Sequence, residues 1–320
     1  MQPAILKHLL DSVVKRNLKI RHQIKQSAST YLCNNGFLEI DTPVLGPLIE
    51  EYTKDNFCVI ADNGVEYALP QSPQIYKQII MIAGYEKYFQ FAHCFRRDPD
   101  TNLSNHHANE FMQIDIEMQT DSLNDVMNTA EELICKILND LNVTCQSPFQ
   151  IIDGNECKLR YGTDKPDLRQ YRNDYSFIWI RNLPLIESVK DFDRIKVTSS
   201  ELKSNDKIYI PSHHIFAKPD HLPYSLEYTE LQKVTTQSFD LVLNGVEICS
   251  GDLRITDRVT QERIMEIFHI DKHKYKFYLD LLKNASSNGG FAIGLDRLTM
   301  LLSGSENIHY SNAFYESWWK

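Results

Sequence analysis

Two acidic residues next to a predicted hairpin turn are spaced for metal chemistry. Apolar runs lead into and out of Asn244-Gly245, which predicts a two-residue turn. In that register Val242 opposes Glu247. Asp240 shares the face of Val242, which makes Asp240 a diagonal neighbour of Glu247. Adjacent carboxylates repel unless a cation or proton lies between them, and Mg²⁺ prefers one or two carboxylates together with phosphate oxygens. Two solvated acids at a sheet edge are the alternative, and the hairpin alone favours neither.

A strand of alternating character carries a second polar group. In residues 111–117 polar and apolar side chains alternate, which places Gln113, Asp115 and Glu117 on one strand face. Amide and acidic groups on one face suit a polar ligand that carries an ammonium group. An ordinary amphipathic strand facing water has the same pattern, and the pattern alone favours that simpler interpretation.

Two predicted helix starts carry cations. Gln74 and Lys77 stand at i and i+3 on a helix with Ser72 as its N-cap, so both side chains face the same way. A lysine and an amide near a helix start can hold a carboxylate, although a solvated helix face is the commoner explanation. Arg297 lies in the first turn of a helix after Gly294, where the guanidinium and the helix N-terminus both favour phosphate.

The sequence contains no glycine-rich phosphate loop. Neither GxxxxGK[ST] nor GxGxxG occurs, so bound ATP would be held by arginines and a metal. Arg96, at the end of a predicted strand, is a candidate, although such arginines are usually structural. The pairs His106-His107 and His213-His214 have no cysteine or carboxylate at zinc spacing, and adjacent histidines on a strand point in opposite directions. A zinc site is therefore not expected.

The elements that would position these residues are a mixture of helices and strands. Residues 6–34 are predicted to form one long amphipathic helix with a basic polar face, ended by Gly36. Residues 50–63 are predicted to be a loop. Further helices are predicted at 72–83, 124–141 and 295–302, and from 261 and 271; strands are predicted at 37–40, 88–96, 111–118 and around the hairpin. The hairpin signals favour an α+β fold in which an antiparallel sheet is flanked by helices.

Composition limits the classes of function. The 320 residues are 42% hydrophobic, and 43 acidic against 34 basic residues give a formal charge of −9. That balance argues against DNA or other non-specific nucleic-acid binding, while a local basic patch for tRNA stays open. The seven cysteines form no CxxC pair, which indicates reduced thiols in a cytoplasmic protein. No apolar run approaches the roughly 20 residues of a membrane span, and the N-terminus does not begin a signal peptide.

Three ordered segments resemble the motifs of class II aminoacyl-tRNA synthetases. FLEIDTP at 37–43 resembles motif 1, FRRD at 95–98 with His107 downstream resembles motif 2, and GLDRL at 294–298 resembles motif 3. The segments 71–78, 161–169, 213–216 and 244–248, followed by Gly251 and Arg254, resemble those of bacterial aspartyl enzymes. The resemblance covers nearly the whole chain. It implies the α+β class II fold, a single catalytic domain over residues 1–320, and a homodimer formed through motif 1 around Pro43.

The family implies a chemistry and a role for each matching residue. Aspartate would be activated by ATP with Mg²⁺ to an aminoacyl-adenylate, with release of pyrophosphate. Three residues would act on the reacting groups: Arg96 on the α-phosphate, Arg297 on the γ-phosphate and Gln113 on the attacking carboxylate. The residues implied for aspartate are Glu51, Gln74, Lys77, Asp115, His213, His214 and Arg254. Those implied for ATP are Phe95, Arg96, Asp98, His107, Glu247, Gly294 and Arg297, and those for Mg²⁺ are Asp240 and Glu247.

The departures from the family pattern concern the acceptor. Motif 1 begins almost at once, so no N-terminal anticodon-binding domain is expected. Residues 161–169 lead directly to Phe177 without the family's inserted domain. The motif 2 loop at 105–109 lacks the family's arginine, and Asp98 replaces a longer acidic residue.

Three functions follow as hypotheses. The first is transfer of the aspartyl group, or that of a close analogue, to ammonia, an amine, a carrier protein or a biosynthetic intermediate. The second is an aminoacyl-tRNA ligase that contacts only the acceptor stem, supported by the basic residues Lys15, Arg16, Lys19, Arg21 and Lys25. The third is a non-catalytic module that binds aspartate or ATP, against which the retention of both motif arginines counts.

Overall fold

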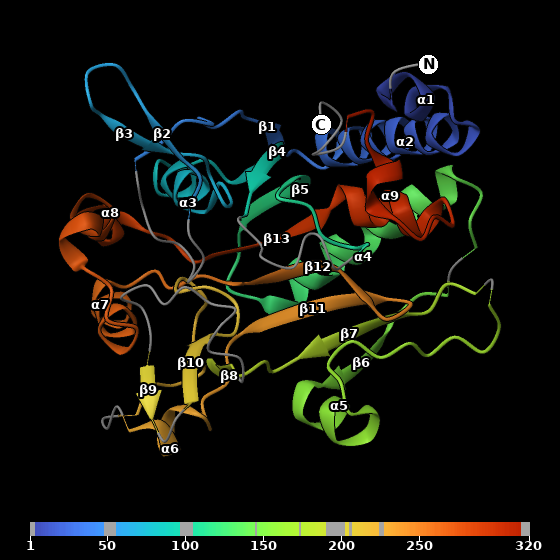
Figure 1. Cartoon of the computed structure of the whole chain (residues 1–320). Coiled ribbons are helices and arrows are strands. Elements are labelled where there is room, and N and C mark those ends of the chain that lie inside the picture. The colour runs from blue at the N-terminus through green and yellow to red at the C-terminus, as the bar shows by residue number, and fades with distance from the viewer. Residues whose placement is uncertain are drawn as a thin grey trace.

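An eight-stranded sheet forms the centre of the molecule (Figure 1). The computed structural model describes residues 4–47, 56–96, 105–144, 146–172, 174–189, 202–204, 207–223 and 227–314. In spatial order the strands are β1 (Leu38–Glu39), β4 (Lys87–Phe95), β5 (Glu110–Gln119), β13 (Asn288–Gly294), β12 (Val246–Leu253), β11 (Ser238–Leu243), β7 (Phe177–Arg181) and β6 (Gln150–Asp153). The six central strands, from β4 through β5, β13, β12 and β11 to β7, pair antiparallel with their neighbours. At the two edges, β1 pairs parallel with β4 and β6 pairs parallel with β7. The predicted α+β fold is confirmed.

Helices cover this sheet and build two separate cores. They are α1 (Ala4–Leu10), α2 (Ser12–Asn34), α3 (Gln74–Ile82), α4 (Leu123–Asp140), α5 (Gly154–Tyr161), α6 (Tyr228–Leu231), α7 (Arg258–Ile267), α8 (Lys276–Leu281) and α9 (Leu295–Leu302). The first core lies between the sheet and α2, α4 and α9, where Ile24, Ile114 and Leu298 are fully buried. The second core joins α3, α7 and α8 around Phe216 and Tyr278. These two groups of helices lie at opposite sides of Figure 1.

The N-terminal helix is divided in two, so the prediction of one continuous helix was wrong. Helix α1 ends at Leu10, and the side chain of Asp11 accepts a hydrogen bond of 2.7 Å from Val13 N at the start of α2. An aspartate is a favourable N-cap because its carboxylate satisfies a backbone N–H that has no partner inside the helix. Gly36, at φ +79°, follows the end of α2 as expected.

Two other predicted boundaries also differ. Within the predicted loop, residues 58–60 form strand β2 (Cys58–Ile60), which pairs with β3 (Glu66–Ala68). Helix α3 begins at Gln74, with Pro73 rather than Ser72 at the N-cap position, but the Ser72 hydroxyl still accepts from Gln74 N at 3.3 Å. The serine therefore caps the helix from one residue further away.

The remaining strands form a small separate sheet in the order β8 (Ile186–Val189), β10 (Lys207–Pro211) and β9 (Leu202–Ser204). Short 3₁₀ helices lie at η1 (Lys272–Tyr275), η2 (Leu282–Asn284) and η3 (Ile308–Ser311). None of the described helices combines the length and apolar character that a bilayer span requires. The cysteines within the described residues are all free thiols.

Candidate active site

A cavity of about 420 Å³ opens on the face of the large sheet opposite the first core. Its walls come from α3, β5, the hairpin β11–β12, the β13–α9 junction and the segment after β10. Most of the predicted site residues line it: Gln74, Lys77, Arg96, His107, Gln113, Asp115, His213, His214, Asp240, Glu247, Arg254, Gly294 and Arg297. Phe95 does not line it, whereas Phe111 does. Glu51 and Asp98 lie outside the described residues.

The face of β5 explains why the cavity is polar on one side of the sheet only. Ile114 and Ile116 are fully buried against the helices of the first core. Gln113 and Asp115, which alternate with them, line the cavity. The two-residue period of the strand therefore separates residues that face the core from residues that face the cavity. The polar face of this strand forms the wall of a cavity, and does not face open water as an ordinary amphipathic strand would.

The hairpin brings Asp240 and Glu247 together as predicted. Val242 pairs with Glu247, and the register then shifts by one residue so that Asp240 pairs with Ser250. Both carboxylates line the cavity. Burial, followed by repulsion from Glu247, raises the pKa of Asp240 well above its usual value. Burial would raise the pKa of Glu247 too, but the cations Lys165 and Arg297 outweigh it and lower that pKa to about 2.

Lys165 is a member of this cluster for which the sequence analysis proposed no role. Its Nζ donates to Oε2 of Glu247 at 2.7 Å, and attraction to Glu247 raises the pKa of the lysine. The hairpin turn packs closely against the segment that carries it, since a Cβ built on Gly245, at φ +83°, would lie 3.3 Å from the Cβ of Asp167. The turn also contacts the chain that follows, where Asn244 accepts from Ser176 N at 2.8 Å. The only sequence signal for Lys165 was its place in the 161–169 segment.

The carboxylate pair fits a magnesium ion that is shared with a phosphate. His213 Nε2 lies 3.6 Å from Asp240, but burial lowers the pKa of this histidine, which favours its neutral form and adds no positive charge beside the carboxyl group. A cation bound at the pair would favour the ionised form of Asp240, whose pKa is otherwise raised. The described residues contain no group of three or more His, Cys, Asp and Glu side chains placed to hold a metal. Two carboxylates with the remaining ligands supplied by phosphate oxygens and water are a typical Mg²⁺ environment.

Arg297 and Arg96 supply positive charge at the same end of the cavity. Arg297 donates from Nη1 to the carbonyl oxygen of Glu247 at 3.0 Å and from Nε to that of His106 at 3.3 Å. Arg96 lies with its guanidinium carbon 5.2 Å from the centre of the Phe111 ring. Both guanidinium groups line the cavity, and such groups match the geometry of phosphate oxygens.

Helix α9 is fixed in place just before Arg297. The carboxylate of Asp296, which is 2% exposed, accepts from Met112 N at 2.6 Å and pairs with Arg21 of α2. One buried side chain thus ties the start of α9 to β5 and to α2. Part of the basic face of α2 thus makes contacts inside the protein, since Arg16 also donates to the carbonyl oxygen of Ser303 at 2.8 Å.

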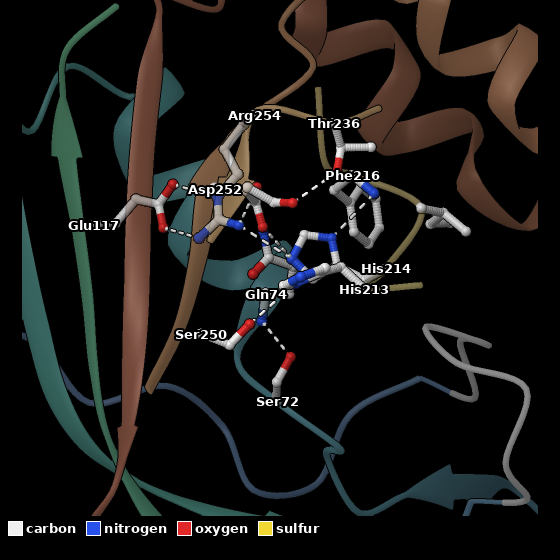
Figure 2. Close-up of polar contacts among 12 residues, drawn as sticks. Ser72, Gln74, Glu117, His213, His214, Phe216, Thr236, Ser250, Asp252 and Arg254 are labelled. Carbon is white, nitrogen blue, oxygen red and sulfur yellow. Dashed lines mark hydrogen bonds and ion pairs between the residues drawn. The ribbon is translucent and has the colours of Figure 1, made fainter. Parts of the chain in front are cut away.

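At the other end of the cavity, Lys77 and Arg254 are surrounded by carboxylates. Figure 2 shows Arg254 with Glu117 and Asp252. Lys77 Nζ lies 3.0 Å from Asp115 and 3.3 Å from Glu117. Arg254 makes two hydrogen bonds of 2.8 Å to Glu117 and pairs with Asp252. These contacts make Asp252 a site residue that the sequence patterns did not indicate. Glu117 was predicted to share the ligand-facing side of its strand, but its contact with Arg254 was not predicted.

A glycine on the neighbouring strand makes room for this network. A Cβ at Gly290 of β13 would lie 2.1 Å from Oε2 of Glu117. The missing side chain therefore lets the carboxylate of Glu117 lie flat against the sheet and reach Arg254.

Two polar atoms in this part of the wall are available to a ligand. Asp115 Oδ1 and Gln74 Nε2 are buried, and within the described part of the chain neither has a hydrogen-bond partner. A buried acceptor or donor without a partner is costly, so a ligand that supplies one is stabilised there. Oδ1 of Asp115 suits an ammonium group, and the Gln74 amide suits a carboxylate or a carbonyl oxygen.

The adjacent histidines bind different partners. His213 Nδ1 lies 3.0 Å from the hydroxyl of Ser250, whereas His214 Nε2 lies 3.1 Å from Asp252. The backbone N–H of Phe216 donates to Nδ1 of His214 at 3.2 Å. Burial lowers the pKa of both rings, and the neighbouring Asp252 offsets only part of that effect.

Comparison with known proteins shows which family this chain belongs to. The family model described as class II tRNA synthetases (D, K and N) matches residues 4–317. An aspartate–tRNA ligase of Staphylococcus haemolyticus is 27% identical over an alignment that includes 93% of this chain and 71% of the relative. One of Fervidobacterium nodosum is 29% identical, with 93% and 71% covered.

Solved structures share the fold. Asparaginyl-tRNA synthetase of Pyrococcus horikoshii, solved with asparaginyl-adenylate, superposes with a TM-score of 0.72 at 18% identity and covers 95% of this chain and 69% of its own. The Entamoeba histolytica asparaginyl enzyme gives a TM-score of 0.69 at 19% identity, with 95% and 67% covered. With the family model matched over nearly its whole length, this chain belongs to the class II tRNA synthetases of the D, K and N group, a family of ATP-dependent, adenylate-forming ligases.

Proposed function

We propose that this enzyme activates the α-carboxylate of aspartate, or of a close analogue, with ATP to form an aminoacyl-adenylate and pyrophosphate. The observation that supports this most is the arrangement of a single cavity. Two arginines and two carboxylates suited to Mg²⁺–ATP lie at one end, and a set of paired charges suited to a small amino acid lies at the other. Gln113 lines the wall of the same cavity.

The roles of the residues follow from this geometry. Oδ1 of Asp115 accepts from the substrate ammonium, and Gln113 orients the attacking carboxylate, which is already a nucleophile and needs no base. Arg96 stabilises the negative charge that develops around the α-phosphate, and Arg297 holds the γ-phosphate. Asp240 and Glu247 hold Mg²⁺, which supplies charge neutralisation on the phosphates. Catalysis is then mainly positioning and electrostatic stabilisation.

We infer that the acceptor is something other than a cognate tRNA, such as ammonia, an amine, a carrier protein or a biosynthetic intermediate. The alignment with the Staphylococcus haemolyticus ligase extends over 419 positions, more than the 320 residues of this chain, so the relative has internal residues that this chain lacks. The internal contacts of Arg16 and Arg21 also reduce the basic surface that α2 could offer to an RNA.

A tRNA ligase that contacts only the acceptor stem is the second candidate. Lys15 and Lys19 of α2 are exposed, which is the observation that favours it. The third candidate, a non-catalytic aspartate or ATP sensor, gains least support, because binding alone does not require both arginines and both carboxylates at the phosphate end.

ATP–pyrophosphate exchange with a panel of amino acids tests the proposal. Exchange with aspartate or an analogue, abolished by Arg297→Ala and kept by the matched control Arg258→Ala on α7, supports adenylation. Ammonia, amines or purified tRNA are then added with the amino acid that supports exchange, and the compound that speeds the consumption of ATP is identified as the acceptor. Charging of tRNA that is lost in a Lys15→Glu/Lys19→Glu variant would support the second candidate. Absence of exchange with every amino acid would refute the catalytic proposal.

A further inference from the structure

Five charged side chains are buried together at the amino-acid end of the cavity, and they do not balance. The cations are Lys77 and Arg254, and the carboxylates are Asp115, Glu117 and Asp252; each is at most 3% exposed. Buried charges are tolerated only when they are compensated, because leaving water costs several kcal/mol for each ion. With all three carboxylates ionised, the two cations leave one negative charge for a ligand to compensate. This shortage of positive charge agrees with the raised pKa of Asp115, whose burial outweighs its attraction to Lys77.

Asp252 is the carboxylate that both pairs with Arg254 and lines the cavity. Glu117 holds the guanidinium through two bonds of 2.8 Å but does not line the cavity. Asp252 pairs with Nη1 of the same guanidinium and does line the cavity. Figure 2 shows Arg254 between these two carboxylates. The arginine is thus already paired with a cavity-lining carboxylate before any substrate enters.

The histidine beside Asp252 does not cancel its charge. His214 Nδ1 accepts a hydrogen bond from Phe216 N at 3.2 Å, so that nitrogen carries no proton. The single proton of the neutral ring is then on Nε2, which lies 3.1 Å from Asp252 and also 3.1 Å from Arg254 Nη1. In that tautomer Nε2 donates to the carboxylate and accepts nothing from the guanidinium. A neutral donor holds the carboxylate ionised and in place, and burial lowers the pKa of the ring in agreement with this state.

The substrate's ammonium group completes the balance of these five charges, because the α-carboxylate in the proposed adenylation faces Gln113 and Arg96 outside this set. An ammonium at Oδ1 of Asp115 brings the cations to three, equal to the carboxylates. A substrate side-chain carboxylate would add a fourth anion next to Asp252 with no cation left to pair with it, and like charges at short distance cost several kcal/mol. A neutral amide adds no charge. Its NH₂ group donates to Asp252, and its oxygen accepts from the remaining N–H groups of Lys77 or Arg254.

We propose that Asp252 sets the specificity of this pocket, so that it selects an amino acid with a neutral, hydrogen-bonding side chain, an amide of the asparagine type, over one with a side-chain carboxylate. This inference rests on the proposed adenylation, and among aspartate and its analogues it names the chemical class that the pocket takes.

The test is ATP–pyrophosphate exchange with asparagine, aspartate, serine and alanine, for the wild type, Asp252→Asn and the exposed matched control Asp62→Asn. We expect the wild type to prefer asparagine to aspartate by on the order of 100-fold in kcat/KM. Asp252→Asn, which removes one negative charge at constant shape, is expected to move that ratio toward aspartate by at least about 10-fold. Asp62→Asn is expected to leave the ratio unchanged. If the Asp252→Asn protein does not fold, Asp252→Ser repeats the test.

Several outcomes would overturn the inference. Aspartate preferred by the wild type, or a ratio unchanged in Asp252→Asn, would refute it while the proposed adenylation stands. If no amino acid supports exchange, adenylation fails, and calorimetric titration of asparagine and aspartate in the presence of ATP tests the pocket directly. Tighter binding of asparagine there, weakened relative to aspartate by Asp252→Asn, supports the inference. Tighter binding of aspartate refutes it.

Discussion

Lys165 Nζ lies 2.7 Å from Oε2 of Glu247, although 82 residues separate the two along the chain. This contact gives the carboxylate pair Asp240 and Glu247 an internal counter-charge. Because it is contributed by a segment outside the hairpin, the electrostatic state of the pair depends on where that segment lies.

Removing the charge of Lys165 is expected to increase the dependence of the protein on divalent cations. In Lys165→Met the buried carboxylates Asp240 and Glu247 face each other with less compensation, so Tm without Mg²⁺ falls and the rise in Tm on adding Mg²⁺ becomes larger than in the wild type. Thermal unfolding with and without MgCl₂ measures both changes. Lys158→Met removes a half-exposed lysine that pairs with Asp164 at 3.3 Å, and it is expected to behave as the wild type. Equal Mg²⁺ responses of the two variants would refute the prediction.

The pair between Arg21 and Asp296 is expected to be the main anchor of α9. Arg21→Met leaves the carboxylate of Asp296, only 2% exposed, without its cation, and breaking a buried pair in this way costs about 3–5 kcal/mol. We expect the lower end of that range because the Arg21 side chain is 14% exposed. Urea unfolding measures the change. The exposed neighbour Lys19, changed to Met, is expected to cost less than about 0.5 kcal/mol, and a similar loss in both variants would contradict the assignment.

Stability is expected to fall as pH drops below about 6.5, the pKa of an unfolded histidine. Burial lowers the folded-state pKa of His214, so between the two pKa values the unfolded chain binds the extra proton and is favoured. The loss reaches at most about 1.4 kcal/mol per pH unit for each such group, and His213 adds to it in the same direction.

His214→Asn, whose side-chain oxygen can still accept from Phe216 N, is expected to flatten this slope. Urea unfolding at pH 7, 6 and 5 measures it, and His273→Asn on the surface is the control. A slope in the His214 variant as steep as in the wild type would show that this ring is not the titrating group.

A homodimer through motif 1 is expected because apolar side chains are exposed around Pro43. Leu38, Val44 and Leu45 are 52%, 45% and 52% exposed at the β1 edge of the sheet. Leu45→Glu places a charge in that surface and is expected to shift the mass from dimer to monomer in light scattering. Leu159→Glu, 88% exposed on α5, is the control that should stay dimeric. A monomeric wild type would contradict the prediction.

Local patterns account for most elements and for one half of the site. Residue alternation on β5 and the turn at Asn244-Gly245 predicted which side chains share a face, because the period of a strand and the length of a hairpin turn are set within a few residues. The same logic extends to Asp252, which stands two residues before Arg254 and therefore shares its face. That signal was present in the sequence and was not used.

Contacts between distant segments account for the rest. Nothing near Lys165 in the sequence indicates Glu247 as its partner, and the shift of register after Val242 is not encoded in the turn. The break in the helix at Asp11 was missed for a different reason. The hydrophobic period continues across this position, whereas the break depends on one side chain, the Asp11 carboxylate that caps α2.

The turn at Gly245 has a further consequence. The bare α-carbon of this residue is the surface against which Asp167 rests, two positions from the lysine that compensates Glu247. A side chain at 245 would strain the left-handed backbone and also push that segment outward. We expect such a substitution to displace Lys165 from Glu247 in a protein that still folds, so a screen based on folding alone would miss it. The two-residue turn thereby helps to determine where Lys165 lies relative to the carboxylate pair.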